Sequence, residues 1–320
     1  MGRATIYDIA SRAGVSVSTV SLAINHPHRV SDATRARIVQ IAHELGYRPD
    51  GAWRARTGGR PVGIAVAAPF TSYRSFGLRL TGILDRLRDT GIDVLVYDLE
   101  SASRVDAPLL DALPIRAGVD GIIVMGVPLS EEGGLKLADW GPPVVLLDAR
   151  HSATPTVLID DERGGRLIGE HLTALGHRHV AFVHEGQRSF DYVSAGMLRG
   201  QGLGDTVERL DSAVWGEDLL SRLPDGVTAI VASHDDLAAR VLRLLRTSGR
   251  AVPGDFSLVG FDDEALADAL GLTTVRQPFE ASGRVAADLL LGLMDGRSAE
   301  VARIQLDVEL VVRETTGALA

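Results

Sequence analysis

The chain has 320 residues, of which 45% are hydrophobic and 23% are charged, and its formal net charge is −9. This composition is typical of a soluble globular protein with two or three domains. Cysteine is absent, which excludes a disulfide framework and thiolate metal sites. No apolar run reaches the ~18 residues needed to span a membrane, and the N-terminus does not have the pattern of a signal peptide. We therefore expect a cytoplasmic protein without a membrane partner.

The charge is distributed unevenly along the chain. Nine arginines against four acidic residues give the first 60 residues a charge of +5, which leaves −14 for the remainder. A basic head on an acidic body is typical of a DNA-binding module carried by another domain. Chance clustering is the alternative, which charge alone does not exclude.

The first 49 residues have the pattern of three short helices. Thr5 with Asp8 has the spacing of a capping box, Gly14 marks a helix end with positive φ, and Ser16 and Ser31 are N-cap residues for two further helices. Apolar side chains recur at helical spacing within each segment, at Ile6, Ile9, Ala10 and Ala13, at Val17, Val20 and Ile24, and at Ile38, Ile41, Ala42 and Leu45. Two short helices joined by a turn at residues 13–16 indicate a helix-turn-helix, whose second helix enters the DNA major groove. Any other small helical bundle fits the same pattern.

From Pro61 onward, apolar runs alternate with amphipathic helical segments. The runs lack a period of two, as buried parallel strands do; they are residues 62–69, 92–99, 119–126, 142–149, 179–186, 227–233 and 256–263. Helical segments lie at 78–91, 161–177, 236–249 and 279–296. This alternation predicts two doubly wound α/β units with parallel sheets, which bind ligands at the carboxyl ends of their strands.

Residues 4–50 resemble the head of the lac-repressor/galactose-repressor family. The elements D-I-A, A-G-V-S, T-V-S, R-V-S and L-G-Y-R-P all fall at the spacing of that family. The segments LGHRHVAFV, VPGDFSLVGFDD and LVVRETT are similar to the family's sensor, so the resemblance covers nearly the whole chain. It implies an all-α helix-turn-helix head plus an α/β sensor of the periplasmic-binding-protein-like fold with two subdomains.

The resemblance also implies domain boundaries. The head covers residues 1–49, a hinge covers 50–60 and the effector-binding and dimerisation domain covers 61–320. Within the last, an N-subdomain takes about 61–158 and 279–306, and a C-subdomain takes about 159–278 and 307–320.

The family's DNA-contact positions transfer to this sequence one by one. Together with the hydroxyls of the second helix they predict DNA binding by Thr5, Tyr7, Ser16, Thr19, Ser21, Asn25, Arg29, Ser31, Thr34 and Tyr47. Val17 and Ser18 occupy the two positions that most determine operator preference; Val17 can meet a thymine methyl, or it is a partly buried residue at the helix start. Leu22 stands where many relatives have arginine, so the operator is expected to differ at the base that such an arginine reads.

The hinge departs from the family as well. Relatives insert a leucine into the minor groove, whereas here the segment is DGAWRARTGG. Trp53 is the large apolar residue available as a wedge, and Arg54 and Arg56 can enter a narrow minor groove. The alternative is that Trp53 packs against the sensor. We expect this hinge to bend DNA less than that of relatives.

The resemblance places an effector site between the two subdomains. Asp148, Asp235 and Asp262 each end an apolar run and can accept hydrogen bonds from sugar hydroxyls; Asp235 can instead cap the following helix. Tyr73, Phe76 and Trp215 are aromatic candidates, each with a core role as the alternative. Val193 stands where relatives have an arginine three residues before a glycine, which predicts a remodelled pocket.

Signals for catalysis or cofactors are weak. Residues 200–204, GQGLG, lack the register and the preceding strand of a dinucleotide-binding loop. His177, His179 and His184 have no metal-ligand spacing, so we expect no metal, no cofactor and no enzyme activity.

The leading hypothesis is a homodimeric repressor that binds a near-palindromic operator and a small-molecule effector. No heptad extension follows RETTGALA, which favours a dimer over a tetramer. The competing hypothesis is a small-molecule binding protein of a transport system.

Overall fold

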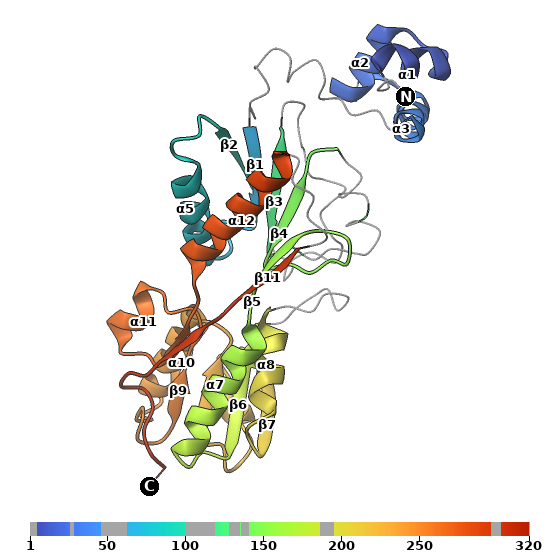
Figure 1. The fold of residues 1–320 in the computed structure, drawn as a ribbon. Coiled ribbons are helices and arrows are strands. Elements are labelled where there is room, and N and C mark those ends of the chain that lie inside the picture. The colour runs from blue at the N-terminus through green and yellow to red at the C-terminus, as the bar shows by residue number, and fades with distance from the viewer. Residues whose placement is uncertain are drawn as a thin grey trace.

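A computed structural model describes residues 5–25, 29–45, 63–99, 119–127, 135, 141–185, 195–295 and 302–319. These residues form a small helical head and a larger α/β body built on two parallel sheets (Figure 1). The fold class expected from the sequence is confirmed. None of the described helices is long and apolar enough to cross a membrane.

The head contains α1 (Ile6–Ala13), α2 (Val17–Asn25) and α3 (Asp32–Glu44). The expected capping is present in each: Thr5 and Asp8 form a capping box at the start of α1, and Ser16 and Ser31 accept hydrogen bonds from the backbone N–H groups of Thr19 and Thr34. Gly14 ends α1 with φ 63°, a left-handed conformation that favours glycine. These local signals determine where the head's helices begin and end.

A small apolar core joins the three helices. It contains Ile9, Ala10 and Ala13 of α1, Val20 and Ala23 of α2, and Ile38 of α3, all buried. Alanines at three of these positions let the helices approach closely. The head core is formed by residues of the head itself, so this module does not draw its core residues from the α/β body.

The first sheet of the body has six parallel strands in the order β11-β5-β4-β3-β1-β2. Its strands are β1 (Gly63–Ala68), β2 (Asp93–Asp98), β3 (Gly121–Met125), β4 (Val144–Leu147), β5 (Thr156–Ile159) and β11 (Arg303–Leu306). Helices α5 (Ser75–Leu87) and α12 (Phe279–Met294) lie against each other and contribute to one core with this sheet (Figure 1). We call this unit the N-subdomain.

The second sheet has four parallel strands in the order β7-β6-β8-β9. Its strands are β6 (His179–His184), β7 (Arg209–Val214), β8 (Ala229–Ala232) and β9 (Ser257–Val259). The accompanying helices are α7 (Asp161–Ala174), α8 (Ala195–Gly204), α9 (Leu219–Arg222), α10 (Asp235–Thr247) and α11 (Ala265–Leu270). A short antiparallel pair, β10 (Thr274–Arg276) with β12 (Glu309–Val311), completes the unit that we call the C-subdomain.

Three segments of the chain connect the two subdomains. They lie between β5 and α7, between β10 and α12, and between β11 and β12. We refer to them as the crossover segments. Their residues lie beside the carboxyl ends of strands from both sheets, which is where ligands bind in α/β folds.

Strand β2 differs from the buried strand that its apolar sequence predicts. Among the described residues it is one of the two edge strands of the first sheet, and its residues are exposed or only half-buried. The prediction of burial is wrong here because an edge strand has a neighbour on one side only. Leu95 and Val96 of β2 consequently reach the surface. Strands β5, β7 and β11 and the β10–β12 pair were not expected from the sequence, since they are short or carry charged residues.

Candidate effector site and DNA-binding face

The described head residues expected to contact DNA lie on α1, on α2 and at the start of α3. Thr5, Ser16, Ser18, Arg29 and Ser31 are exposed, and the side chain of Tyr7 is among the most exposed hydrophobic groups of the chain. Thr19, Ser21 and Thr34 are half-buried. Ser16 also shares a hydrogen bond of 2.8 Å with Thr19 Oγ1. Two of the hydroxyls that we expect at DNA phosphates therefore also stabilise the start of α2.

The residues expected to read bases differ in their exposure. Ser18 is exposed, whereas Val17 is half-buried and packs against the head core. This packing supports the structural alternative for Val17, although part of its side chain remains exposed. Leu22 is half-buried on the same helix, and Asn25 is the last residue of α2. Tyr47, Trp53, Arg54 and Arg56 lie outside the described residues.

Two of the three candidate carboxylates end strands in an unusual backbone conformation. Asp148 follows β4 with φ 58°, and Asp262 follows β9 with φ 121°. Residues other than glycine are strained at positive φ, and such strain concentrates at functional sites. The next residue, Asp263 with φ 58°, forms ion pairs with Arg276 and Arg313 that hold the turn from outside. Asp262 instead accepts a hydrogen bond from Gln277 of the second crossover segment.

A chain of polar side chains connects these carboxylates across the two subdomains. Arg79 of α5 donates to Asp148 at 2.9 Å and to Gln277 in the second crossover segment at 3.4 Å. Gln277 donates in turn to Asp262 at 2.5 Å. Arg199 of α8 lies 3.7 Å from Asp262 and donates to Asp161, the first residue of α7, at 2.8 Å. We call Asp148, Arg79, Gln277, Asp262, Arg199 and Asp161 the polar chain.

Arg199 corrects the inference drawn from Val193. Val193 itself lies outside the described residues, but the spacing of an arginine three residues before a glycine recurs at Arg199 and Gly202. Arg199 is buried, donates to the carbonyl oxygen of Ser233 and stacks on the ring of Phe261 at 3.8 Å. The expectation that this segment has lost its arginine is therefore wrong.

Close helix packing holds Arg199 in place. A Cβ atom at Gly202 would lie 1.9 Å from the carbonyl oxygen of Glu162, and one at Gly165 would lie 2.1 Å from the carbonyl oxygen of Arg199. Glycines at both positions let the backbones of α7 and α8 touch. This contact is what brings the guanidinium of Arg199 to the carboxylate of Asp161.

Asp235 has a structural set of hydrogen bonds. It is buried at the start of α10 and accepts from the hydroxyl of Thr274 at 2.7 Å and from the backbone N–H of Glu264 at 3.1 Å. The cap residue of α10 is His234, so the alternative role of Asp235 as a helix cap is not what the structure shows. Asp235 instead anchors the residues that follow Asp262.

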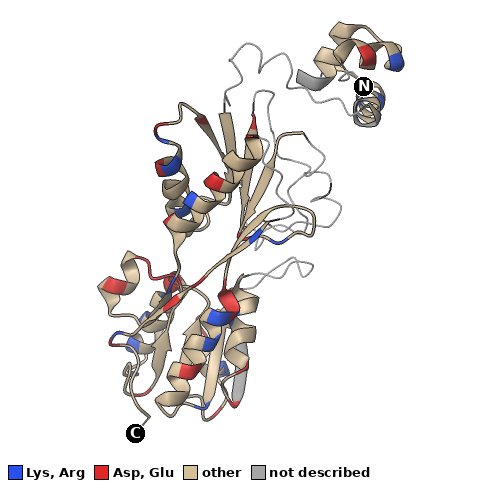
Figure 2. Cartoon of the chain, in the orientation of Figure 1, with Lys and Arg blue, Asp and Glu red and all other residues tan. Residues whose placement is uncertain are grey.

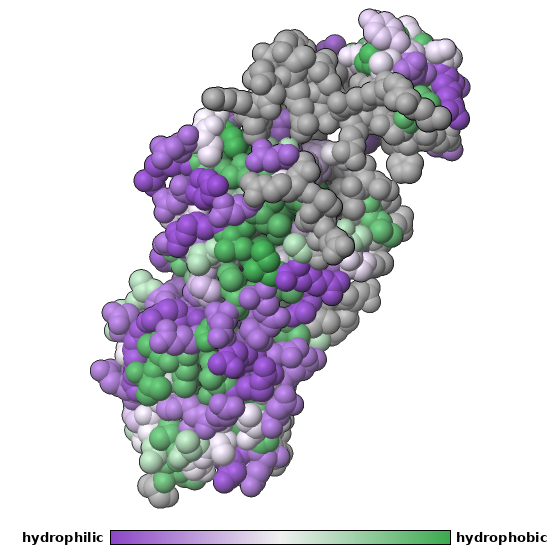
Figure 3. Space-filling model, viewed as in Figure 1, coloured by the Kyte–Doolittle hydropathy of each residue, from purple (hydrophilic) through white to green (hydrophobic). Residues whose placement is uncertain are grey.

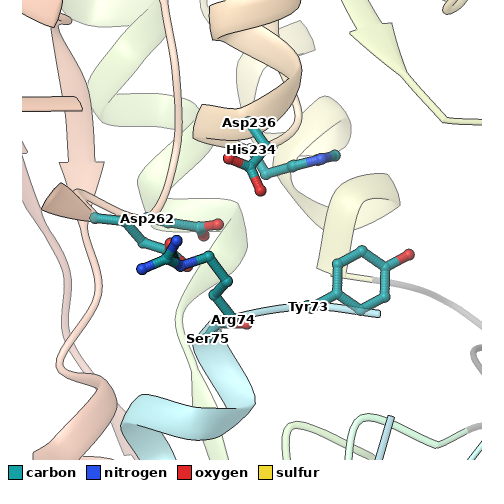
Figure 4. Close-up of a pocket in the computed structure, with 7 residues that line it drawn as sticks. Tyr73, Arg74, Ser75, His234, Asp236 and Asp262 are labelled. Carbon is teal, nitrogen blue, oxygen red and sulfur yellow. Dashed lines mark ion pairs between the residues drawn. The ribbon is translucent and has the colours of Figure 1, made fainter. Parts of the chain in front are cut away.

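A pocket with an empty volume of about 240 Å³, part of it open to solvent, lies beside the polar chain. Its lining comes from both subdomains (Figure 4): Tyr73, Arg74 and Ser75 from the start of α5, His234 and Asp236 from the start of α10, and Asp262 and Glu264 from the turn after β9. Two contacts cross between the subdomains here. Arg74 lies 3.6 Å from Glu264, and the rings of Tyr73 and His234 meet edge to face at 6.3 Å.

The other aromatic candidates do not line this pocket. Phe76 is buried in the core of the N-subdomain, against Gly126. Trp215 packs against the core of the C-subdomain and lies under Arg240, whose guanidinium carbon is 5.5 Å from the ring. The contacts of Phe76 and Trp215 are those of the core alternative, whereas Tyr73 lies where an effector contact was expected.

Burial dominates the electrostatics of this region. It raises the pKa of Asp161 to about 6 and that of Asp235 to about 7, and it raises the pKa of Asp262 well above the ordinary value. Arg199 opposes the shift at both Asp161 and Asp262. Burial likewise raises the pKa of Glu264 and lowers that of His234. Shifted carboxyl groups facing a pocket are typical of a binding or catalytic site.

These shifts predict how stability depends on pH. The folded protein binds protons at Asp161 and Asp235 more tightly than the unfolded chain, whose aspartates titrate near 3.8. Their contribution is present below the unfolded pKa and is lost as pH rises through about 4 to 7, by up to ~1.4 kcal/mol per pH unit for each group. We expect urea unfolding to show a lower stability at about pH 8 than at about pH 5, with a smaller difference in Asp161→Asn. A stability that rises over this range would contradict the assignment.

Several residues of the site were not anticipated from the sequence. Arg79 lies on the face of α5 that otherwise buries Phe76, Ile83 and Leu87, and an arginine at an apolar helix position was the available signal. The second R-x-x-G spacing was the signal for Arg199. No sequence pattern predicted Gln277, His234 or Glu264 as site residues. They reach the site because the crossover segment and the turns before α10 and α11 bring them there.

A helical head joined to two parallel-sheet subdomains, with a polar pocket between them, defines a ligand-responsive DNA-binding regulator. Residues 5–50 match the family described as bacterial regulatory proteins, lacI family, and residues 170–316 match the periplasmic binding protein-like domain. Among curated relatives, the chain is 31% identical to the transcriptional regulator DegA of Bacillus subtilis, over 99% of both chains. It is 30% identical to CelR of Thermobifida fusca, over 98% of both. The chain belongs to the LacI family of transcription regulators.

Solved structures agree with this family assignment. A LacI-family regulator from Enterococcus faecium with bound ribose has a TM-score of 0.68 at 25% identity, covering 81% of this chain and 100% of that one. The complex of CelR with cellobiose has a TM-score of 0.66 at 29% identity, covering 98% and 100%. The lac repressor dimer bound to operator and an anti-inducer has a TM-score of 0.66 at 27% identity, covering 99% and 100%.

Proposed function

We propose that this regulator is a repressor whose operator binding is controlled by a hydroxyl-bearing small molecule in the pocket between its subdomains. The observation that carries the proposal is the polar chain, which joins strand ends of both sheets through a crossover segment. In Figure 2, acidic and basic residues lie together at the start of α7, where the first crossover segment enters the C-subdomain. A ligand that changes these contacts binds one arrangement of the subdomains more tightly than another. Such a difference in affinity between two states is what allosteric control requires.

The lining of the pocket indicates the ligand's chemistry. Asp236, Asp262 and Glu264 supply hydrogen-bond acceptors, and Tyr73 supplies an aromatic edge. Acceptors of this kind suit hydroxyl donors. Structural neighbours have been solved with ribose and with cellobiose bound, which supports a sugar or a related metabolite for this chain. We propose a supporting role for Asp235, in which its hydrogen bonds with Thr274 and the N–H of Glu264 hold the turn that carries Asp262 and Glu264.

Exposed apolar side chains support a homodimer. Leu78 and Leu84 of α5, Leu95 and Val96 of β2, and Leu266 of α11 are all exposed. These three elements lie along one side of the body in Figure 1, and Figure 3 shows that hydrophobic side chains also reach the surface of both subdomains in that view. A second copy that covers this side would present two heads, each for one half of a near-palindromic operator. We propose that the domain boundaries lie at 49 and 60, as expected from the sequence, with the subdomains divided at the crossover segments.

The head supplies DNA recognition in this proposal. In this proposal Ser16, Thr19, Ser31 and Thr34 contact the DNA backbone, and Val17 and Ser18 contact bases. Because chromosomal DNA is the partner, we infer that the protein acts in the cytoplasm and is a regulator rather than an enzyme. The competing role, a transport-system binding protein, does not use the basic head.

Selection of bound DNA from a random library tests the proposal directly. We expect the full chain to enrich a near-palindrome, and Val17→Ala with Ser18→Ala to change the preferred bases in each half by about tenfold in affinity. Ser11→Ala, an exposed position on α1, serves as the matched control. Repeating the selection with a sugar panel shows whether a ligand alters binding. Failure to enrich any symmetric sequence would favour the transport role.

A further inference from the structure

Arg79 is an unusual residue in the pattern of α5. It is 1% exposed and ranks among the largest fully buried side chains of the described residues. Its helix touches α12 so closely that a Cβ atom at Gly283 would lie 2.0 Å from the carbonyl oxygen of Arg79. The guanidinium extends from this contact past the rings of Phe76 and Phe279, at 5.4 and 4.7 Å from their centroids. An apolar side chain would fill the same space without bringing a charge into the core.

The contacts of Arg79 do not account for it as a stabilising residue. Its Nε is buried and has no hydrogen-bond partner, which leaves an unsatisfied donor in the core. Replacing a buried ion pair with apolar groups is often neutral or stabilising. The position of this arginine is therefore better explained by what its Nη2 atom contacts, which is Asp148 and Gln277.

The first of these contacts occupies Asp148, the effector-contact candidate beside the pocket, and the second leads through Gln277 to Asp262, which lines the pocket. Asp148 receives its charged hydrogen bond from Arg79, and Asp262 receives one from Gln277, which Arg79 positions. The guanidinium carries a positive charge, so its ion pair with Asp148 is stronger than the hydrogen bond that a neutral hydroxyl donates to the same carboxylate. Asp262 lines the pocket and the side chain of Asp148 is 15% exposed, whereas Arg79 is almost fully buried, so a ligand meets these carboxylates before it meets the guanidinium.

We propose that Arg79 is a specificity-determining residue that competes with hydroxyl-bearing effectors for Asp148 and, through Gln277, for Asp262. The inference rests on the proposed function of the pocket and adds to it. An effector must therefore supply enough hydrogen-bond donors to replace those of Arg79 at Asp148 and of Gln277 at Asp262. Neutral sugars with few well-placed hydroxyls are thereby rejected, although the acceptors that they need are present.

The test uses the full-length chain with Arg79→Met, which keeps the bulk of the side chain and its packing on two aromatic rings but removes the charge and the donors. Arg86→Met is the matched control, since Arg86 lies on the same helix and pairs with Asp288 at the surface. The probes are D-ribose, cellobiose and D-gluconate, measured by calorimetry. We expect Arg79→Met to bind at least one of the two neutral sugars about tenfold more tightly than the unaltered protein does, and Arg86→Met to show no change.

Unchanged or weaker binding of both neutral sugars by Arg79→Met would overturn the proposal. So would gluconate binding that is lost in Arg79→Met, because that result makes the guanidinium a direct ligand of the effector. Operator binding measured on the same samples distinguishes the proposed function from the role proposed for Arg79. Absence of operator binding in the unaltered chain counts against the proposed function. Operator binding that is retained in Arg79→Met without a gain in sugar affinity counts only against the role of Arg79.

A second measurement does not depend on the folding of Arg79→Met. The ¹⁵Nε and ¹³Cζ resonances of Arg79 report its ion pair in the unaltered protein. We expect both to move in Asp148→Asn and to move in the same direction as a bound sugar is titrated in. If the chemical shifts of Arg79 stay the same in Asp148→Asn and during the sugar titration, Arg79 does not share a partner with the ligand, and the proposal is wrong.

Discussion

Arg199→Met is expected to lower the free energy of unfolding by about 3–5 kcal/mol, because it leaves buried carboxylates without their cation. Arg199 lies between Asp161 and Asp262 and donates to Asp161 at 2.8 Å. The side chains of Arg199 and Asp161 are 9% and 3% exposed, so water cannot replace the lost contact. Urea unfolding followed by circular dichroism measures the loss, and we expect any ligand response of operator binding to disappear with it.

A double variant separates the charge effect from lost packing. Asp161→Asn in the Arg199→Met background removes one of the stranded charges and is expected to restore about 1–3 kcal/mol. The matched control is Arg240→Met, since Arg240 pairs with Glu185 where both side chains are more than a third exposed; it is expected to cost less than about 1 kcal/mol. Equal losses at Arg199 and Arg240 would contradict the buried ion-pair explanation.

Ile9→Ala is expected to remove most operator binding while leaving the body folded. Ile9 is completely buried in the head core, and truncating a buried isoleucine costs about 2–5 kcal/mol. A module of about 45 residues has little stability to lose. Since only folded heads bind DNA, the apparent affinity falls in proportion to the folded fraction. A mobility-shift titration should show a loss of more than about tenfold.

The control for this prediction is Ser11→Ala, which alters an exposed side chain of the same helix. Sugar binding by calorimetry checks that the body of the Ile9→Ala protein is intact, since the body has its own core clusters. Loss of both sugar binding and operator binding would show that the head and the body do not fold separately. Unchanged operator affinity would show that the head tolerates the cavity.

The head illustrates what local sequence can predict. Thr5, Gly14, Ser16 and Ser31 act through atoms within a few residues of themselves, and all four have the expected capping or backbone geometry. The strands β1, β3, β4, β6, β8 and β9 of the body were predictable because burial imposes continuous apolar runs on parallel strands, whereas the shorter or more polar strands gave no such run. The exposure of β2 was not predicted, because an edge strand can have the same apolar pattern as a central one. The pattern alone does not say which strand lies at the edge of a sheet.

The site shows the limit of such predictions. Asp148 and Asp262 were found because strand ends are marked in sequence, and both carry the positive φ of a strained turn. Arg79 and Gln277, far apart along the chain, meet only because α5 packs on α12 and a crossover segment passes beside them. The family's arginine precedes a glycine by three residues, and both Val193 before Gly196 and Arg199 before Gly202 have this spacing. The packing of α7 on α8 shows that Arg199 is the residue at the site.

The sequence by itself therefore determined the class of protein, the helix-turn-helix at residues 5–25 and the strand ends that bear the acidic groups, since each depends on local patterns. Tertiary structure alone decided which charges neighbour one another. It made Asp235 a structural anchor, buried Phe76 in one core, packed Trp215 against another and placed Arg79 on Asp148. Charge pairing depends on distances of a few ångströms between residues that are remote in sequence, and those distances are set by how the helices and sheets pack.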